Sequence, residues 1–133
     1  MDTSQLLVIV AFALLAFFVL RPLLFGGPRV SATEAQARIK AGTAVLVDVR
    51  EPGEWPDGVA TPASLLPMSD FRGARKQWGG FLRNNKDKEL ILYCASGMRS
   101  GSIAGALKKE GYKVANLGGF GGWAGAGLPV RKP

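Results

Sequence analysis

An unbroken run of apolar residues, LLVIVAFALLAFFVL, covers Leu6 to Leu20 of this 133-residue chain. With the residues up to Phe25 it reaches about 20 residues, the length that an α-helix needs to cross a bilayer. The run is apolar on every side, whereas a helix packed on a soluble core is apolar on one face only. We therefore predict a transmembrane helix over residues 6–25, preceded by a short extracytoplasmic segment, residues 1–5.

The charges beside this run predict its orientation. No Lys or Arg precedes the run. After it come Arg21, Arg29, Arg38 and Lys40. Because positively charged flanks stay in the cytoplasm, we expect a single-pass protein of the cell inner membrane with its larger part in the cytoplasm. A cleaved signal peptide is the alternative, but no Lys or Arg precedes the run and no Ala-x-Ala site directly follows it, as such a peptide would need.

Residues 26–29 begin with Gly26-Gly27-Pro28, which is typical of a linker. Residues 30–133 suit one compact domain. Ser31 and Glu34 have the spacing of a capping box, in which each side chain bonds the other's backbone amide at the start of a helix. Helix and strand patterns then alternate, which predicts an α/β fold with a mainly parallel central sheet flanked by helices. The expected elements are a helix over 32–40, strands over 44–47 and 64–66, a helix from 69 to about 83, a strand over 89–93, a helix from about 100 to 110 and a strand over 113–117.

The content of cysteine, histidine and charge limits the chemistry. The chain has one cysteine and no histidine. An internal disulfide, a His-based metal site, a Ser-His triad and a Cys-His dyad are therefore excluded, and we expect neither a metal nor a cofactor. The net charge of +7 is spread along the chain without a nucleic-acid-binding module. That distribution argues against a nucleic-acid partner and favours a small anionic ligand.

Cys94 follows a predicted strand directly and precedes a short loop that opens a helix. Backbone amides of residues 95–99 are expected to form a cradle for an anion there, and Arg99 adds a formal charge. Both effects favour a thiolate and lower the thiol pKa. Ser96 and Ser100 are candidates to donate hydrogen bonds to the sulfur, and Ser100 is equally a candidate helix cap. A lone cysteine is otherwise most simply an inert buried residue, but its setting here favours a nucleophile. The predicted site is Cys94 with the loop residues Ala95, Ser96, Gly97, Met98, Arg99 and Ser100.

A thiolate without a general acid needs a leaving group that departs without a proton. Thiosulfate and persulfides meet this need, because they release sulfite or a thiolate. We therefore expect a small anionic sulfur donor that converts Cys94 to a persulfide. An external acceptor, either cyanide or a thiol on a small molecule or a protein, then takes the sulfur, since the chain has no second cysteine.

Asp48 also ends a predicted strand, so it is expected at the same sheet edge as Cys94. With Arg50 it forms either a buried ion pair or a tether for the active-site loop, and a supporting role is favoured over contact with substrate.

Three segments in order resemble the rhodanese homology domain, over about residues 30–130. Residues 94–100 are similar to its loop Cys-x-x-Gly-x-Arg-Ser, and residues 47–55 to its Asp-x-Arg strand and turn. Asn116-Leu-Gly-Gly119 with Trp123, followed by residues 127–130, is similar to its C-terminal signature. The resemblance implies an α/β fold, a persulfide mechanism and Cys94 as the catalytic residue of a single-domain sulfurtransferase, here with an N-terminal membrane anchor.

The departures from the family pattern leave alternatives open. Ala95 stands where the family often has Arg or Lys, and residues 58–63 lack a His and a Gly of the usual motif. The first removes a cation near the pocket and leaves a larger persulfide donor open beside thiosulfate, and the second predicts a repacked loop. Four residues separate Cys94 from Arg99, whereas related phosphatases of the cell-cycle type have five, so the smaller cradle suits sulfur better than phosphate. The alternative from another class is a membrane-tethered, non-catalytic module that binds a partner or senses persulfides.

Overall fold

The computed structural model describes residues 1–25 and 27–133, and the surroundings of the side chains at 1–20 and 27–133. Gly26, the first residue of the predicted linker, lies outside the described residues. Helix α1 covers Thr3–Phe25 and begins beside Asp2, whose carboxylate accepts the amide N–H of Gln5 at 2.8 Å.

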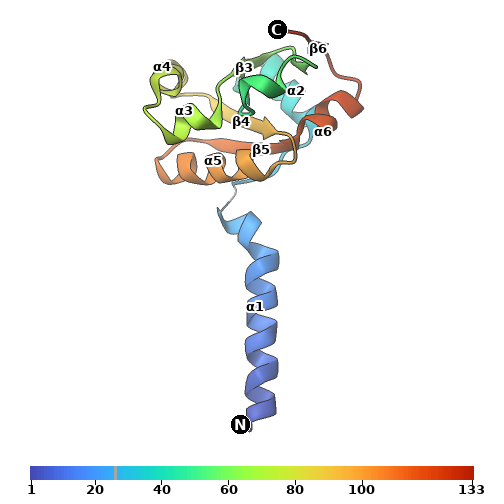
Figure 1. Ribbon diagram of the computed structural model, residues 1–133, viewed down its shortest axis with the longest axis vertical. Coiled ribbons are helices and arrows are strands. Elements are labelled where there is room, and N and C mark those ends of the chain that lie inside the picture. Colours follow the sequence, from blue (N-terminus) through green and yellow to red (C-terminus); the bar gives the residue numbers. More distant parts are fainter. Residues whose placement is uncertain (26) are drawn as a thin grey trace.

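Helix α1 differs from every other element in its exposure. Its large apolar side chains from Leu6 to Leu20 are 46% to 68% exposed, and Figure 1 shows α1 extending away from the folded domain. Outside α1 and Met1, the exposed large apolar side chains of the described residues are only Met98 and Val130. Among those residues, α1 is the one helix long and apolar enough to cross a membrane. An apolar surface of this extent is unfavourable in water and favourable in lipid.

The domain is built on a four-stranded sheet in the order β3-β1-β4-β5, which confirms the predicted α/β fold. These strands are β1 (Ala44–Asp48), β3 (Ala63–Leu65), β4 (Glu89–Cys94) and β5 (Val114–Gly119), and every pair is parallel. In the β1–β4 register, Asp48 lies opposite Tyr93. The carboxyl ends of the two central strands therefore meet at one edge of the sheet, as the sequence predicts.

Helices cover both faces of the sheet (Figure 1). On one face lie α2 (Ala32–Lys40) and α6 (Phe120–Gly125), and on the other lie α3 (Met68–Arg72), α4 (Lys76–Asn84) and α5 (Met98–Lys109). Strand β4 alternates between the two cores, because successive side chains of a strand point to opposite faces. Its residues 90, 92 and 94 join the core under α5, and residues 91 and 93 join the core under α2. Cys94 therefore faces α5.

The prediction of one helix from Ser69 to about residue 83 is wrong. Helix α3 ends at Arg72 with Gly73 as its C-cap, and α4 starts at Lys76. The carboxylate of Asp70 causes the break: it accepts the backbone amides of residues 76, 77 and 78 at 2.9, 3.0 and 2.9 Å and so caps the second helix. Ser69 does not cap α3, since its amide and hydroxyl both donate to Glu51.

Three smaller features also differ from the sequence prediction. The Ser31 hydroxyl accepts the amide of Glu34 at 3.1 Å as expected, but the Glu34 carboxylate pairs with Arg38 instead of returning to Ser31. A second, antiparallel sheet joins β2 (Val59–Ala60) to β6 (Val130–Arg131), and a 3-10 helix covers Pro52–Glu54. Pairs as short as β2 and β6 carry too little pattern to be seen in sequence.

Candidate active site

Cys94 is the last residue of β4, a strand buried along its whole length. Residues 95–97 connect it to α5, which starts at Met98. Gly97 closes this connection with φ +96°, a conformation that residues with a side chain rarely adopt. A Cβ at Gly97 would lie 3.0 Å from the Cα of Gly118, so the loop packs closely on the end of β5. The tight turn is what brings the start of α5 back onto the sulfur.

The sulfur of Cys94 accepts hydrogen bonds from this loop and helix. The amide of Gly97 donates to Sγ at 3.0 Å, and the hydroxyl of Ser100 lies 3.4 Å from Sγ. Burial raises the pKa of the Cys94 thiol, but hydrogen bonds from the Ser100 hydroxyl and from backbone amides outweigh burial, so the pKa is lowered. Those amides belong to residues 100, 97 and 96. Ser96 thus acts through its backbone, and Ser100 acts on the sulfur rather than as the N-cap, which is Gly97.

A buried asparagine that the sequence analysis gave no role braces this loop. Asn116 of β5 donates from Nδ2 to the carbonyl of Gly97 at 3.0 Å, and its Oδ1 accepts Ser100 Oγ at 2.8 Å and the Gly118 amide at 3.0 Å. Because a hydroxyl has one hydrogen, the Cys94 sulfur and Asn116 compete for that of Ser100. A polar residue inside an otherwise apolar strand pattern was the available signal for this role.

The guanidinium of Arg99 forms an ion pair with the carboxylate of Glu54. Its Nη1 and Nη2 donate to the two carboxylate oxygens of Glu54 at 2.6 and 2.9 Å. This bidentate contact is the main reason that the pKa of Glu54 is lowered to about 2. It is also the main reason that the pKa of Arg99 is raised, and the Cys94 thiolate raises the Arg99 pKa by a smaller amount. The positive charge expected to act on Cys94 is therefore largely neutralised by Glu54, a residue to which the sequence analysis gave no role.

Asp48 and Arg50 form the expected buried ion pair, with Arg50 Nη2 2.8 Å from Asp48 Oδ2. The Tyr93 hydroxyl donates to Asp48 at 2.7 Å and accepts the amide of Ala60 at 2.9 Å. Burial is the main cause of the raised pKa of Tyr93, so this hydroxyl stays protonated. Arg50 also donates to the carbonyls of residues 54 and 58 at 3.3 and 2.8 Å, which ties the loop carrying Glu54 to the sheet.

Three other predicted residues of the loop region lie at the surface. Ala95 and Ser96 are exposed and Met98 is 81% exposed, whereas Cys94 itself is fully buried. No group of Cys, Asp and Glu side chains in residues 1–25 and 27–133 is arranged to hold a metal ion.

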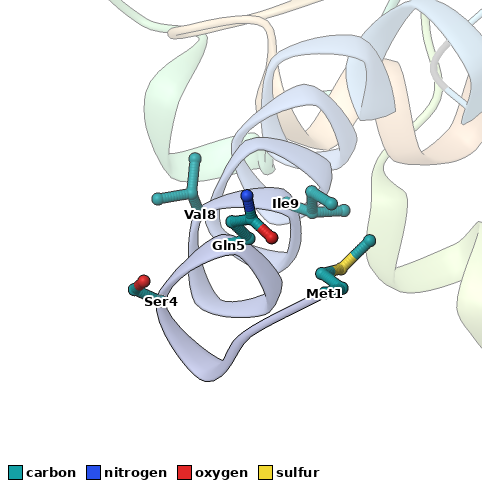
Figure 2. Close-up of a pocket in the computed structure, with 5 residues that line it drawn as sticks. All are labelled: Met1, Ser4, Gln5, Val8 and Ile9. Carbon is teal, nitrogen blue, oxygen red and sulfur yellow. The ribbon is translucent and has the colours of Figure 1, made fainter.

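Figure 2 shows a pocket of the molecule away from Cys94, lined by Met1, Ser4, Gln5, Val8 and Ile9. It lies on the exposed surface at the start of α1 and contains no nucleophilic thiol or charged side chain. We therefore place the candidate chemistry at Cys94.

Residues 31–126 match the rhodanese-like domain. The chain belongs to the rhodanese family. It is 32% identical over 126 residues to the uncharacterized protein YqhL of Bacillus subtilis (strain 168), which covers 92% of this chain and 94% of YqhL. It is 36% identical over 91 residues to a sulfurtransferase of Allochromatium vinosum, which covers 67% of this chain and 79% of that protein.

A solved structure has the same rhodanese fold. The rhodanese-related protein of Thermoplasma volcanium superposes with a TM-score of 0.66 at 27% identity, over 80% of this chain and 99% of that protein. The fold and the family expected from the sequence are thus confirmed. The individual roles of the loop residues remain predictions.

Proposed function

We propose that this rhodanese-family protein is a sulfurtransferase that carries sulfane sulfur on Cys94. The observation that carries the proposal is the hydrogen bond from the Gly97 amide to Cys94 Sγ, at the end of β4 and the start of α5. Together with Ser100 it stabilises a thiolate, which is the nucleophilic form of cysteine, without any imidazole.

The proposed reaction has two displacements at sulfur. The Cys94 thiolate attacks the outer sulfur of thiosulfate or of a persulfide, an S–S bond to Cys94 forms, and sulfite or a thiolate leaves with the electron pair. A thiolate acceptor or cyanide then attacks the outer sulfur of the Cys94 persulfide, and the Cys94 thiolate departs. No proton transfer is required in either displacement. Because Cys94 is fully buried, part of its surroundings has to move for the donor to reach the sulfur.

The experiment uses the full chain in a neutral detergent, treated with thiosulfate or with glutathione persulfide. Intact-mass spectrometry is expected to detect the addition of one sulfur atom that a reductant removes, and cyanide is expected to yield thiocyanate. Cys94→Ala should abolish both, while its tryptophan fluorescence stays that of the folded domain. Absence of the adduct in the wild-type protein with both donors would contradict the proposal.

The burial of Cys94 favours a second candidate, a membrane-tethered module that binds a partner and catalyses nothing. In that case the wild-type protein acquires no sulfur, and a partner retained on the full chain is also retained on Cys94→Ala. The same mass measurement therefore separates the two functions.

We also propose that α1 anchors the protein in the cell inner membrane as a single span, with the domain in the cytoplasm. Support comes from its exposed apolar side chains and from the basic residues that follow the run but do not precede it. Protease added to spheroplasts, which lack an intact outer membrane, should leave the domain uncut and should cut it once the inner membrane is opened. Cutting of the domain in closed spheroplasts would show the opposite orientation.

A further inference from the structure

The segment that joins α1 to the domain adds to the sheet beside the active-site loop. Arg29 forms a parallel bridge with Asn116, in which the Asn116 amide donates to the carbonyl of Pro28 at 2.8 Å and the Val30 amide donates to the carbonyl of Asn116 at 3.1 Å. These linker residues precede residues 31–126, the part that matches the rhodanese-like domain. The linker thus places a residue from outside the family domain next to Asn116, which braces the Cys94 loop.

The side chain of Arg29 lies against that loop. Its Nη1 is 3.7 Å from the position that a Cβ of Gly97 would take, and its Nη2 is 3.0 Å from the corresponding position at Gly118. The amide of the same Gly97 donates to Cys94 Sγ. Gly97 therefore lies beside the Arg29 guanidinium and also contacts the sulfur of Cys94 through its amide.

The two cations beside the loop differ in their partners. Arg99 is held by Glu54, and because the pKa of Glu54 is about 2 this pair stays charged at neutral pH. The side chain of Arg29 is exposed and forms no hydrogen bond or ion pair with residues 1–20 and 27–133. Ala95 adds no charge. Of these two cations, Arg29 is the one whose charge no carboxylate neutralises.

We propose that Arg29 binds the anionic group of the sulfur donor while the donor's sulfane sulfur meets Cys94. The donor class is a compound with a sulfonate or carboxylate close to its sulfane sulfur. A guanidinium suits such groups, because its planar set of donors matches their oxygens. This inference rests on the proposed sulfur transfer and assigns Arg29 as a specificity-determining residue.

The experiment compares donors of different charge on the full chain in neutral detergent. Thiosulfate is a dianion and methanethiosulfonate a monoanion. Arg29→Gln should lower kcat/KM for thiosulfate about tenfold and for the monoanion about threefold, because the lost attraction scales with donor charge. Arg29→Lys should restore most of the loss. Arg72→Gln, which removes an exposed charge from α3, is the matched control and should leave both values unchanged.

Equal losses for the two donors, or no recovery in Arg29→Lys, would mean that Arg29 only supports the loop and would overturn the assignment. Unchanged kinetics in Arg29→Gln would overturn it as well.

A binding measurement separates this inference from the proposed function. Thiosulfate is titrated calorimetrically into Cys94→Ala, which cannot react, and into Cys94→Ala combined with Arg29→Gln. The dissociation constant should rise about tenfold in the double variant. Such binding without any sulfur transfer in the wild-type protein would refute the transferase and keep the anion site. Sulfur transfer with equal thiosulfate binding in both variants would refute the anion site alone.

Discussion

The neighbouring strands β1 and β4 each end in a buried residue that can form an anion, Asp48 and Cys94. The two side chains differ in the groups that stabilise their negative charge. Asp48 contacts a formal cation, Arg50, at 2.8 Å and the Tyr93 hydroxyl at 2.7 Å. Cys94 contacts the Gly97 amide at 3.0 Å and the Ser100 hydroxyl at 3.4 Å, which are dipoles, and the cation Arg99, which also acts on the sulfur, is paired with Glu54. The carboxylate is therefore neutralised and serves the framework. The thiolate is stabilised without being neutralised, so it keeps its electron pair for attack.

The buried pair at the end of β1 also supports the loop after β4 that holds Cys94. Arg50 holds the carbonyls of residues 54 and 58, and Glu54 in turn holds Arg99 at the start of α5. Substitutions at the β1 end should therefore mainly change stability, and substitutions at the β4 end should mainly change thiol reactivity.

The largest effect on stability is expected from Asp48→Ala. It leaves the Arg50 guanidinium, only 7% exposed, without its partner. Breaking one side of a buried pair costs about 3–5 kcal/mol of unfolding free energy. Urea unfolding followed by tryptophan fluorescence measures the domain alone, because Trp55, Trp78 and Trp123 all lie outside α1.

The matched control for this change is Glu110→Ala. Its pair with Arg75 has side chains 33% and 39% exposed, and exposed pairs contribute less than about 1 kcal/mol. A loss in Asp48→Ala no greater than in Glu110→Ala would remove the distinction between the two strand ends.

The next effect is expected from Gly97→Ala. The residue has φ +96°, and its new Cβ would meet the backbone of Gly118 at 3.0 Å, so the loop has to shift and its amide leaves the sulfur. The alkylation rate of Cys94 at neutral pH should fall about tenfold as its pKa rises. Gly121→Ala is the control, since a Cβ there meets no atom within 4 Å. An unchanged rate in Gly97→Ala would show that this amide does not hold the thiolate.

A smaller effect is expected from Ser100→Ala. The variant removes one donor near Sγ but keeps the amides, and Asn116 keeps its contact with the Gly118 amide. The Cys94 pKa should rise, so the alkylation rate at neutral pH should fall about threefold. Ser102→Ala, on the exposed side of α5, should have no effect. Equal rates in both serine variants would assign the hydroxyl of Ser100 to Asn116 alone.

The local part of the site could be predicted from sequence. A buried strand that ends in Cys94, a glycine at a tight turn and a following helix have short-range signatures, and the structure has them at residues 89–109. The missing parts are contacts between distant residues. Glu54 and Arg99 are 45 positions apart, and Asn116 and Gly97 are 19 apart. No periodic pattern in the sequence predicts either contact, because the contacts depend on how β5 and the loop after β1 pack.

The error at residues 69–83 has a related cause. Apolar spacing continues through α3 and α4, so it predicts one helix, but the Asp70 carboxylate caps the second helix and Gly73 ends the first. The hydrogen bonds of the capping side chain therefore determine where the second helix begins, although the apolar spacing alone predicts one continuous helix.

The central claim is that dipoles of the loop ionise Cys94, and the most direct test is the pH dependence of its alkylation in the full chain. A lowered pKa keeps the thiolate present as the pH falls, so the rate should decline only well below the range of an ordinary cysteine. The profile should contain one ionisation, because no histidine is present and the Glu54 pKa of about 2 lies far below it. A midpoint at or above that of a free cysteine would contradict the account.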